Sequence, residues 1–294
     1  MTKRPYIGVT GFMHPTEIEI VQDLFDPAGS HQLMVGLLVS AKSWRGLPTR
    51  HASCYPDPAR LGELVAAVDP ARAFALVHYN AFGPASPPNY ASRKEWLDDE
   101  DVLFDDCIAI LRRLTDGSPD MAERFGGFQY NFPLPNRASL YWLETRREKR
   151  CGTPTRSVLQ LWPRQLEMVR PFLNDDREWS EVLDYLYASH RQNTNFWPFG
   201  TLLCDASGGQ GCVLNPTEVI ASLEPLIHLT QRKTDLNLAV AGGLSAETVP
   251  ILKPVIETYP ELSIDAQGRL RDDHDRLDLD AVRHYVEAAL KLLS

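Results

Sequence analysis

Short apolar runs alternate along the chain with segments in which apolar residues recur every three or four positions. This alternation predicts βα units, since a buried parallel strand is a short apolar run and its helix carries the longer period. Five predicted strands are residues 6–10, 33–39, 74–79, 127–131 and 157–162. Three further strands are predicted at the apolar starts of the runs 202–211, 238–244 and 262–268.

The predicted helices lie between these strands, at residues 15–25, 59–68, 99–114, 137–147, 176–189, 217–229, 246–258 and 279–293. Strict alternation of eight strands with eight helices favours an α/β fold of the (β/α)8 barrel type over a doubly wound open sheet. We therefore expect one barrel domain over residues 1–294. The segments 40–58, 81–98 and 163–199 are expected to be loop insertions on or beside the active-site face.

Composition excludes several classes of function. The formal net charge of -9 argues against non-specific binding to nucleic acid, which needs an excess of Lys and Arg. No apolar run is long enough to cross a membrane, and residues 1–6 contain no signal-peptide core, so we expect a cytoplasmic protein without a membrane partner. The five cysteines are scattered and form no CxxC pair, which indicates reduced thiols and no zinc site. We expect neither a metal nor a cofactor, and the sequence leaves open whether the chain forms a homodimer.

Glycines follow each of the last three predicted strands. They are Gly208, Gly209 and Gly211, then Gly242 and Gly243, then Gly268. Glycines at this edge of a barrel let backbone N–H groups converge on an anion, and the phosphate site of such barrels is typically near strands seven and eight. The pattern predicts a phosphorylated small-molecule ligand; the alternative is that each glycine only serves a turn.

Acidic residues end two of the same strands. Asp205 closes a strand that we expect to be buried, and burial that raises the pKa of its carboxyl group would suit a general acid. A structural ion pair is the alternative reading of Asp205. Asp265 has the equivalent place on the last strand and is expected either to hold ligand hydroxyl groups or to cap the following turn.

Other polar residues lie near strand ends. His78 and Asn80 share one face of the third strand by its period of two, which makes His78 a candidate base if that face lines the barrel mouth. A buried structural histidine is equally compatible. Gln129 and Gln160 are candidate pocket-lining residues, and Arg45 follows the second strand, where a guanidinium group would either clamp a carboxylate or remain solvated.

Taken in order, these motifs resemble the phosphoribosylanthranilate isomerase family of tryptophan biosynthesis. Ile7-Gly8-Val9-Thr10 is similar to the family's Cys-Gly-Ile-Thr, Leu203-Cys204-Asp205 to its Leu-Leu-Asp, Gly208-Gly209-Gln210-Gly211 to its Gly-Gly-Thr-Gly, and Asp265-Ala266-Gln267-Gly268 to its Asp-Val-Ser-Ser-Gly. Lys42-Ser43-Trp44-Arg45 resembles its Ser-Pro-Arg loop, Val77-His78-Tyr79-Asn80 its third strand, Gly127-Phe128-Gln129 its fourth, and Ala241-Gly242-Gly243-Leu244 is the best match.

The resemblance implies a TIM barrel of the phosphoribosyl-binding type and a particular reaction. That reaction is an Amadori rearrangement of an aminoaldose phosphate to an aminoketose. It would make Asp205 the general acid, place Arg45 on the anthranilate carboxylate and put the phosphate among the glycines.

The departures concern the chemistry. The family's general base, a cysteine, falls on Ile7, which cannot accept a proton, and its Lys after the glycine loop falls on Cys212. The Glu after the last glycine motif is absent, because Arg269 and Leu270 follow Gly268.

Three hypotheses follow from this combination. The chain is an isomerase that recruits its base elsewhere, with His78 the first candidate; or a different phosphosugar enzyme such as a lyase, epimerase or hydrolase; or a non-catalytic protein that binds a phosphorylated ligand. In each case the expected partner is a small phosphorylated molecule.

Overall fold

The structure is a computed structural model. It describes residues 4–47, 52–80, 105–115, 119–130, 143, 146–147, 149–151, 156–161, 200–205, 215–232 and 236–293.

Eight parallel strands pair in chain order, and the last pairs with the first to close a barrel. They are β1 (Tyr6–Thr10), β2 (Gln32–Ser40), β3 (Ala73–Asn80), β4 (Phe125–Tyr130), β5 (Val158–Leu161), β6 (Thr201–Asp205), β7 (Asn237–Ala241) and β8 (Ser263–Ala266). All eight predicted strands are therefore confirmed, with ends that differ by no more than about two residues.

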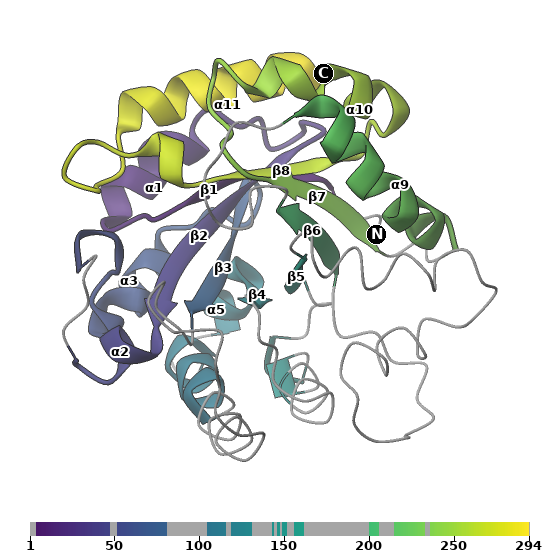
Figure 1. Ribbon diagram of the computed structural model, residues 1–294. Helices are drawn as coiled ribbons and strands as arrows, with labels where there is room; N and C mark the ends of the chain where they lie inside the picture. The colour runs from purple at the N-terminus through teal and green to yellow at the C-terminus, as the bar shows by residue number, and fades with distance from the viewer. Residues whose placement is uncertain are drawn as a thin grey trace, which may run out of the picture.

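Helices surround the strands (Figure 1). They are α1 (Pro15–Gln22), α2 (Ala41–Trp44), α3 (Leu61–Ala66), an unlabelled helix at 105–115, α5 (Pro119–Arg124), α9 (Pro216–Arg232), α10 (Lys253–Thr258) and α11 (Leu279–Leu293). In Figure 1, α1, α11, α10 and α9 lie along one side of the barrel and α3 and α5 along the other. Among the described residues, no helix has the length and apolar character needed to cross a membrane.

Two hydrophobic clusters separate the inside of the barrel from its outside. The smaller one joins side chains from six strands, namely Tyr6, Met34, Phe74, Leu76, Val158, Leu203 and Ala239. In a closed barrel, side chains from strands on all sides meet only in the interior, so these residues mark the inward face of each strand. The larger cluster lies between the outward face and the helices and includes Ile7, Val9, Val77 and Tyr79.

The second connection differs from the loop expected over residues 40–58, because α2 follows β2 directly. Ser40 caps this helix: its hydroxyl accepts a hydrogen bond from the Ser43 N–H at 3.0 Å, and the Ser43 hydroxyl accepts one from the Ser40 N–H at 3.0 Å. This reciprocal cap is a signal that the sequence contained.

The helix predicted at 246–258 also differs. Residues 246–248 form a turn, a 3-10 helix η3 covers Val249–Leu252, and α10 begins only at Lys253. Pro250 and Pro254 explain the division, because proline has no N–H with which to continue the helical ladder.

The helix predicted at 59–68 is shorter in the structure, because the 3-10 helix η2 (Pro58–Arg60) precedes α3. The helix α5 was not predicted. The helix predicted at 176–189 and most of that at 137–147 lie outside the described residues.

Candidate functional site

A set of buried polar side chains faces the barrel interior near the carboxyl ends of the strands. They are Thr10, His78, Gln129, Gln160, Asp205 and Asp265, and we call this set the polar ring. Period-two alternation places His78, Gln160 and Asp205 on the same faces as the interior residues Leu76, Val158 and Leu203. Because active sites of (β/α)8 barrels lie at this end, the polar ring is the candidate active site.

Asp265 lies against β1, in space that a glycine leaves free. A Cβ atom built on Gly8 would lie 2.5 Å from Oδ1 of Asp265 and 2.6 Å from the methyl carbon of Met34. The Thr10 hydroxyl donates a hydrogen bond to the same Oδ1 at 3.3 Å. Glycine at position 8 therefore lets the carboxyl group of Asp265 reach across to β1.

Burial raises the pKa of Asp265 to about 7. The negative charge of Asp205 adds to this rise, while the hydrogen bond from Thr10 opposes it. Asp265 consequently exchanges its proton near neutral pH, which is the range that suits general acid–base catalysis.

Asp205 is held by a chain of amide groups. Nε2 of Gln160 donates to Oδ2 of Asp205 at 2.7 Å, and Nε2 of Gln129 donates to Oε1 of Gln160 at 3.4 Å. Asp205 and Asp265 pair in register with the same residue of β7, Ala241, from opposite sides. The two carboxyl groups are thus in one row of the barrel with only a small side chain between them.

His78 belongs to the polar ring but is a weak candidate for the base. Burial lowers the pKa of His78 to about 3, so its imidazole is neutral at physiological pH and has little tendency to take a proton. Its Nε2 is buried and makes no hydrogen bond within the described structure. This nitrogen is therefore a candidate hydrogen-bonding group for a ligand. The Asn80 backbone ends β3, and its side chain lies outside the described part of the structure.

The predicted phosphate glycines are only partly described. Gly242 and Gly243 have φ angles of 112° and 59°, which favour glycine. They lead into a turn in which the Thr248 hydroxyl donates to the Gly243 carbonyl at 2.9 Å and accepts from the Ser245 N–H at 2.8 Å. The turn requirement thus accounts for both glycines, and their phosphate role stays a prediction.

Gly268 begins the 3-10 helix η4 (Gly268–Leu270), and a Cβ atom added to it would meet nothing within 4 Å. Neither a turn nor a close approach therefore requires glycine at this position. Gly208, Gly209 and Gly211 lie outside the described residues.

The structure does not bring Arg45 into the polar ring. Its Nη2 forms an ion pair with Oδ2 of Asp106 at 2.8 Å, and the Tyr79 hydroxyl donates to the same oxygen at 2.6 Å. Tyr79 belongs to the outward-facing cluster, so this group of three ties α2 and β3 to the helix at 105–115.

Ile7, on which the family's cysteine falls, also faces outward into the helix layer. The inward position beside it is Gly8, next to which the Asp265 carboxyl group lies. The place of a base on β1 is therefore occupied by a side chain that comes from β8.

Arg271 is a residue that the sequence reasoning missed. Its Nη2 donates to the Thr10 carbonyl at 3.4 Å and its Nη1 to the Asp275 carbonyl at 2.8 Å, although its side chain is only 5% exposed. Gly11, with a φ angle of 113°, allows this guanidinium to approach the end of β1. Its Nε lies 3.7 Å from Oδ1 of Asp275, so Arg271 is a buried, ion-paired guanidinium beside the polar ring. Arg271 lies five residues beyond β8, where no strand pattern pointed to it.

Within the described segments, no group of three or more His, Cys, Asp and Glu side chains is arranged to hold a metal ion. Cys54, Cys107, Cys151 and Cys204 are buried and make no disulfide. The side chains of the polar ring can themselves transfer protons and form hydrogen bonds.

Comparisons of sequence identify no relative. No model of a known protein family matches the chain, and no curated protein sequence matches it either.

Solved structures share its fold. The exo-β-1,4-mannosidase Op5Man5 from Opitutaceae bacterium strain TAV5 aligns over 99% of this chain and 60% of its own, with 10% identity and a TM-score of 0.50. A xylanase and α-amylase inhibitor protein, XAIP-II, from Scadoxus multiflorus aligns over 98% of both chains with 11% identity and a TM-score of 0.49. A GH18 chitinase from Pseudoalteromonas aurantia covers 96% of this chain and 99% of its own, with 11% identity and a TM-score of 0.48.

At such identities a likeness shows only the fold, which is a (β/α)8 TIM barrel. This is a fold on which many enzymes are built, with their sites at the carboxyl ends of the strands.

Proposed function

We propose that this TIM barrel is an enzyme that catalyses proton transfer on a phosphorylated sugar, in an aldose–ketose isomerisation of the Amadori type. The observation that carries the proposal is the pair of buried carboxyl groups, Asp205 and Asp265, on either side of Ala241. Burial of two acids at a strand end costs free energy, which a catalytic role explains.

The two carboxyl groups divide the work between them. Such an isomerisation needs an acid to open the sugar ring and a base to remove the proton from C2. The resemblance assigns the acid to Asp205, which Gln160 positions. Asp265 then serves as the base that Ile7 cannot be, since its pKa of about 7 allows it to accept a proton and release it again at neutral pH.

The remaining groups would bind the substrate. The neutral His78 offers a hydrogen bond to a sugar hydroxyl group. The glycines after β6, β7 and β8 would hold the anionic part of the substrate. The Arg271 guanidinium beside Thr10, which Asp275 pairs at 3.7 Å, adds positive charge nearby. Arg45 is left out of this site because Asp106 holds it on the outer side of the barrel.

The proposal is tested by proton exchange, which detects the chemical step whatever the final product is. The protein is incubated in D2O with a panel of aldose and aminoaldose phosphates, including phosphoribosylanthranilate, and 1H NMR follows the signal of the C2 proton. We expect one substrate to lose this signal, and Asp265→Asn to slow the loss by at least about 100-fold.

Asp205→Asn should slow turnover to a similar extent while binding of the phosphosugar, seen by thermal melting, is kept. Asp273→Asn is the matched control, because Asp273 is an exposed acid a few residues beyond β8. Exchange that persists in Asp265→Asn would overturn the role of Asp265. Tight binding of a phosphosugar without exchange of any panel member would instead indicate a different reaction class on the same barrel.

A further inference from the structure

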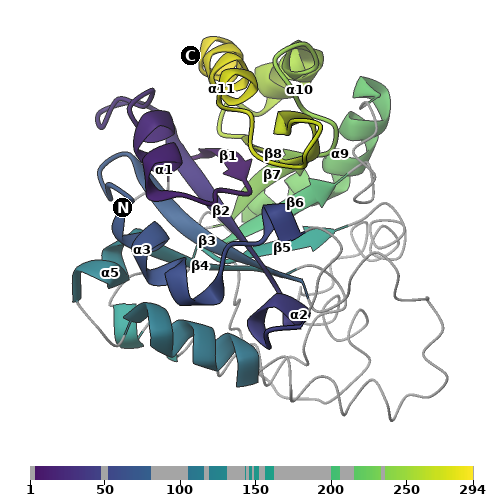
Figure 2. The ribbon, with the colours of Figure 1, turned by 90° about the vertical axis from the view of Figure 1, so that its left-hand side faces the viewer.

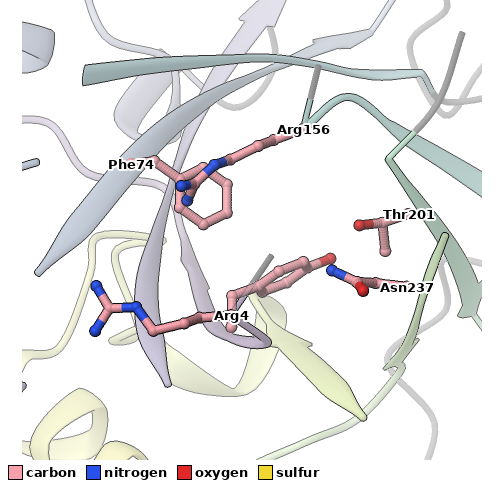
Figure 3. A pocket seen from close by; sticks show the side chains of 6 residues that line it. Arg4, Phe74, Arg156, Thr201 and Asn237 are labelled. Carbon is pink, nitrogen blue, oxygen red and sulfur yellow. The ribbon is translucent and has the colours of Figure 1, made fainter. Parts of the chain in front are cut away.

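A second pocket lies at the opposite, amino-terminal end of the barrel. Its lining consists of Arg4, Tyr6, Phe74, Arg156, Thr201 and Asn237, which come from strand starts and from the residues just before them (Figure 3). Its enclosed space is about 10 Å3, the room of about one water molecule, and the rest of the pocket opens to solvent. Figure 2 shows the strands from the side; the pocket lies at their starts, and the polar ring lies at their carboxyl ends.

Arg156 is a partly buried cation without an acidic partner in this pocket. Its guanidinium lies 4.4 Å from the centre of the Phe74 ring, and Nη1 donates to Oε1 of Gln32 at 2.6 Å. Within the described structure, no Asp or Glu carboxylate forms an ion pair with it. A buried charge of this kind is expensive unless an opposite charge compensates it.

The surroundings of Arg156 add positive charge. Burial lowers the pKa of Arg156 to about 10, and the positive charges of Arg4 and Arg147 contribute to this lowering. Arg4 is fixed nearby by hydrogen bonds to the carbonyl groups of Pro27 and Ala71, at 2.8 Å each. In Figure 3 the Arg4 guanidinium points away from Thr201 and Asn237, so Arg4 acts here through its charge.

Uncharged polar groups complete the lining. The Tyr6 side chain is 2% exposed, and its hydroxyl has no hydrogen-bond partner within the described residues. Thr201 and Asn237 lie across the cavity from Arg156 (Figure 3). A buried hydroxyl without a protein partner is unusual, because such groups are normally satisfied by protein, ordered water or a ligand, so Tyr6 is available to bind one here.

We propose that the amino-terminal pocket binds a small oxyanion, a phosphate or carboxylate group, through Arg156, the Tyr6 hydroxyl and the Asn237 amide. An oxyanion neutralises the unpaired guanidinium and accepts hydrogen bonds from all three groups. Because the enclosed space holds about one water, the anion lies at the open mouth of the pocket and directs one oxygen inward. The proposal does not depend on the reaction at the carboxyl end.

The test is thermal melting at constant ionic strength while inorganic phosphate replaces chloride. The melting temperature of the wild-type protein should rise with the logarithm of phosphate concentration, by about 3 °C at ten times the Kd. Arg156→Gln should lose the part of the rise that comes from this pocket, so that it responds less than the wild-type protein. Asn237→Leu, which changes the opposite wall and leaves Arg156 in place, should weaken phosphate binding at least about tenfold.

Two control variants show whether phosphate acts at this pocket or elsewhere on the molecule. Arg276→Gln removes an exposed arginine and should keep the full response. Ala241→Leu fills the space between Asp205 and Asp265 at the other end of the barrel and should also keep it. A response of Arg156→Gln equal to that of the wild-type protein would overturn the proposal, and so would a response that disappears in Ala241→Leu, because it would then arise at the carboxyl end of the barrel. A selenate ion located at Arg156 by its anomalous scattering in crystals would confirm the site directly.

Discussion

Asp265 is the residue on which the proposed chemistry depends, and its environment predicts a pH dependence. The ionised carboxylate is the form that accepts a proton, and the pKa of Asp265 is about 7. We expect kcat/KM to rise with pH through about 7 and to fall about tenfold per pH unit below about 6. A profile that stays flat down to pH 4 would contradict this assignment and would point to a base of low pKa, such as His78.

The raised pKa of Asp265 also predicts that its carboxyl group lowers the stability of the folded protein at the pH at which it would act as a base. The folded state raises the pKa of Asp265 from 3.8 to about 7, so it binds this proton more tightly than the unfolded chain does. The contribution of Asp265 to stability is therefore greatest below pH 4 and is lost as the pH rises to 7. Asp265→Asn should raise the free energy of unfolding at pH 8 by at most about 4 kcal/mol, with no gain at pH 4. Urea unfolding of both proteins at the two pH values measures this difference; equal gains at both would refute it.

At the scale of elements, β1 shapes the site by having no side chain at Gly8. Gly8→Ala places a methyl group 2.5 Å from Oδ1 of Asp265, which must move and lose its bond to Thr10. We expect a cost of about 1–3 kcal/mol in stability, measured by urea unfolding, and a loss of most activity. The control is Gly62→Ala in α3, where nothing lies within 4 Å and alanine should stabilise by about 0.5–1 kcal/mol. Full activity in Gly8→Ala would show that the Asp265 position is unimportant.

The connection from β2 to the helix layer makes a further prediction. Because Arg45 forms an ion pair with Asp106, Arg45→Ala should cost about 0.5–1 kcal/mol in stability. Asp106→Ala should cost about 1–3 kcal/mol, since it also leaves the Tyr79 hydroxyl without its acceptor, and both variants should leave KM unchanged. Thermal melting and steady-state kinetics on both variants provide the test. A rise in KM in Arg45→Ala alone would restore the carboxylate-binding role that the resemblance implies for this residue.

For the whole molecule, the sequence predicted the barrel because each buried parallel strand is a continuous apolar run with a helix after it. It also predicted the polar strand ends Asp205, Gln160, Gln129 and His78, since these interrupt apolar runs at or near their carboxyl ends. What it missed depends on contacts between distant strands. The side chain of Asp265, near the other end of the chain, fills the space at Gly8. Arg271 reaches Thr10 from a loop, where no hydrophobic periodicity indicates which way a side chain points. Ile7 was aligned with a catalytic position, yet barrel closure turns it toward the helices.

The central claim is that the polar ring is a ligand site, and thermal melting against a panel of phosphosugars tests it most directly. The panel includes a stable reduced analogue of phosphoribosylanthranilate. The account predicts that one phosphosugar raises the melting temperature of the wild-type protein and of Arg156→Gln, and that Ala241→Leu loses the effect because its larger side chain fills the space between the two carboxyl groups. A shift that persists in Ala241→Leu, or no shift with any phosphosugar, would contradict it.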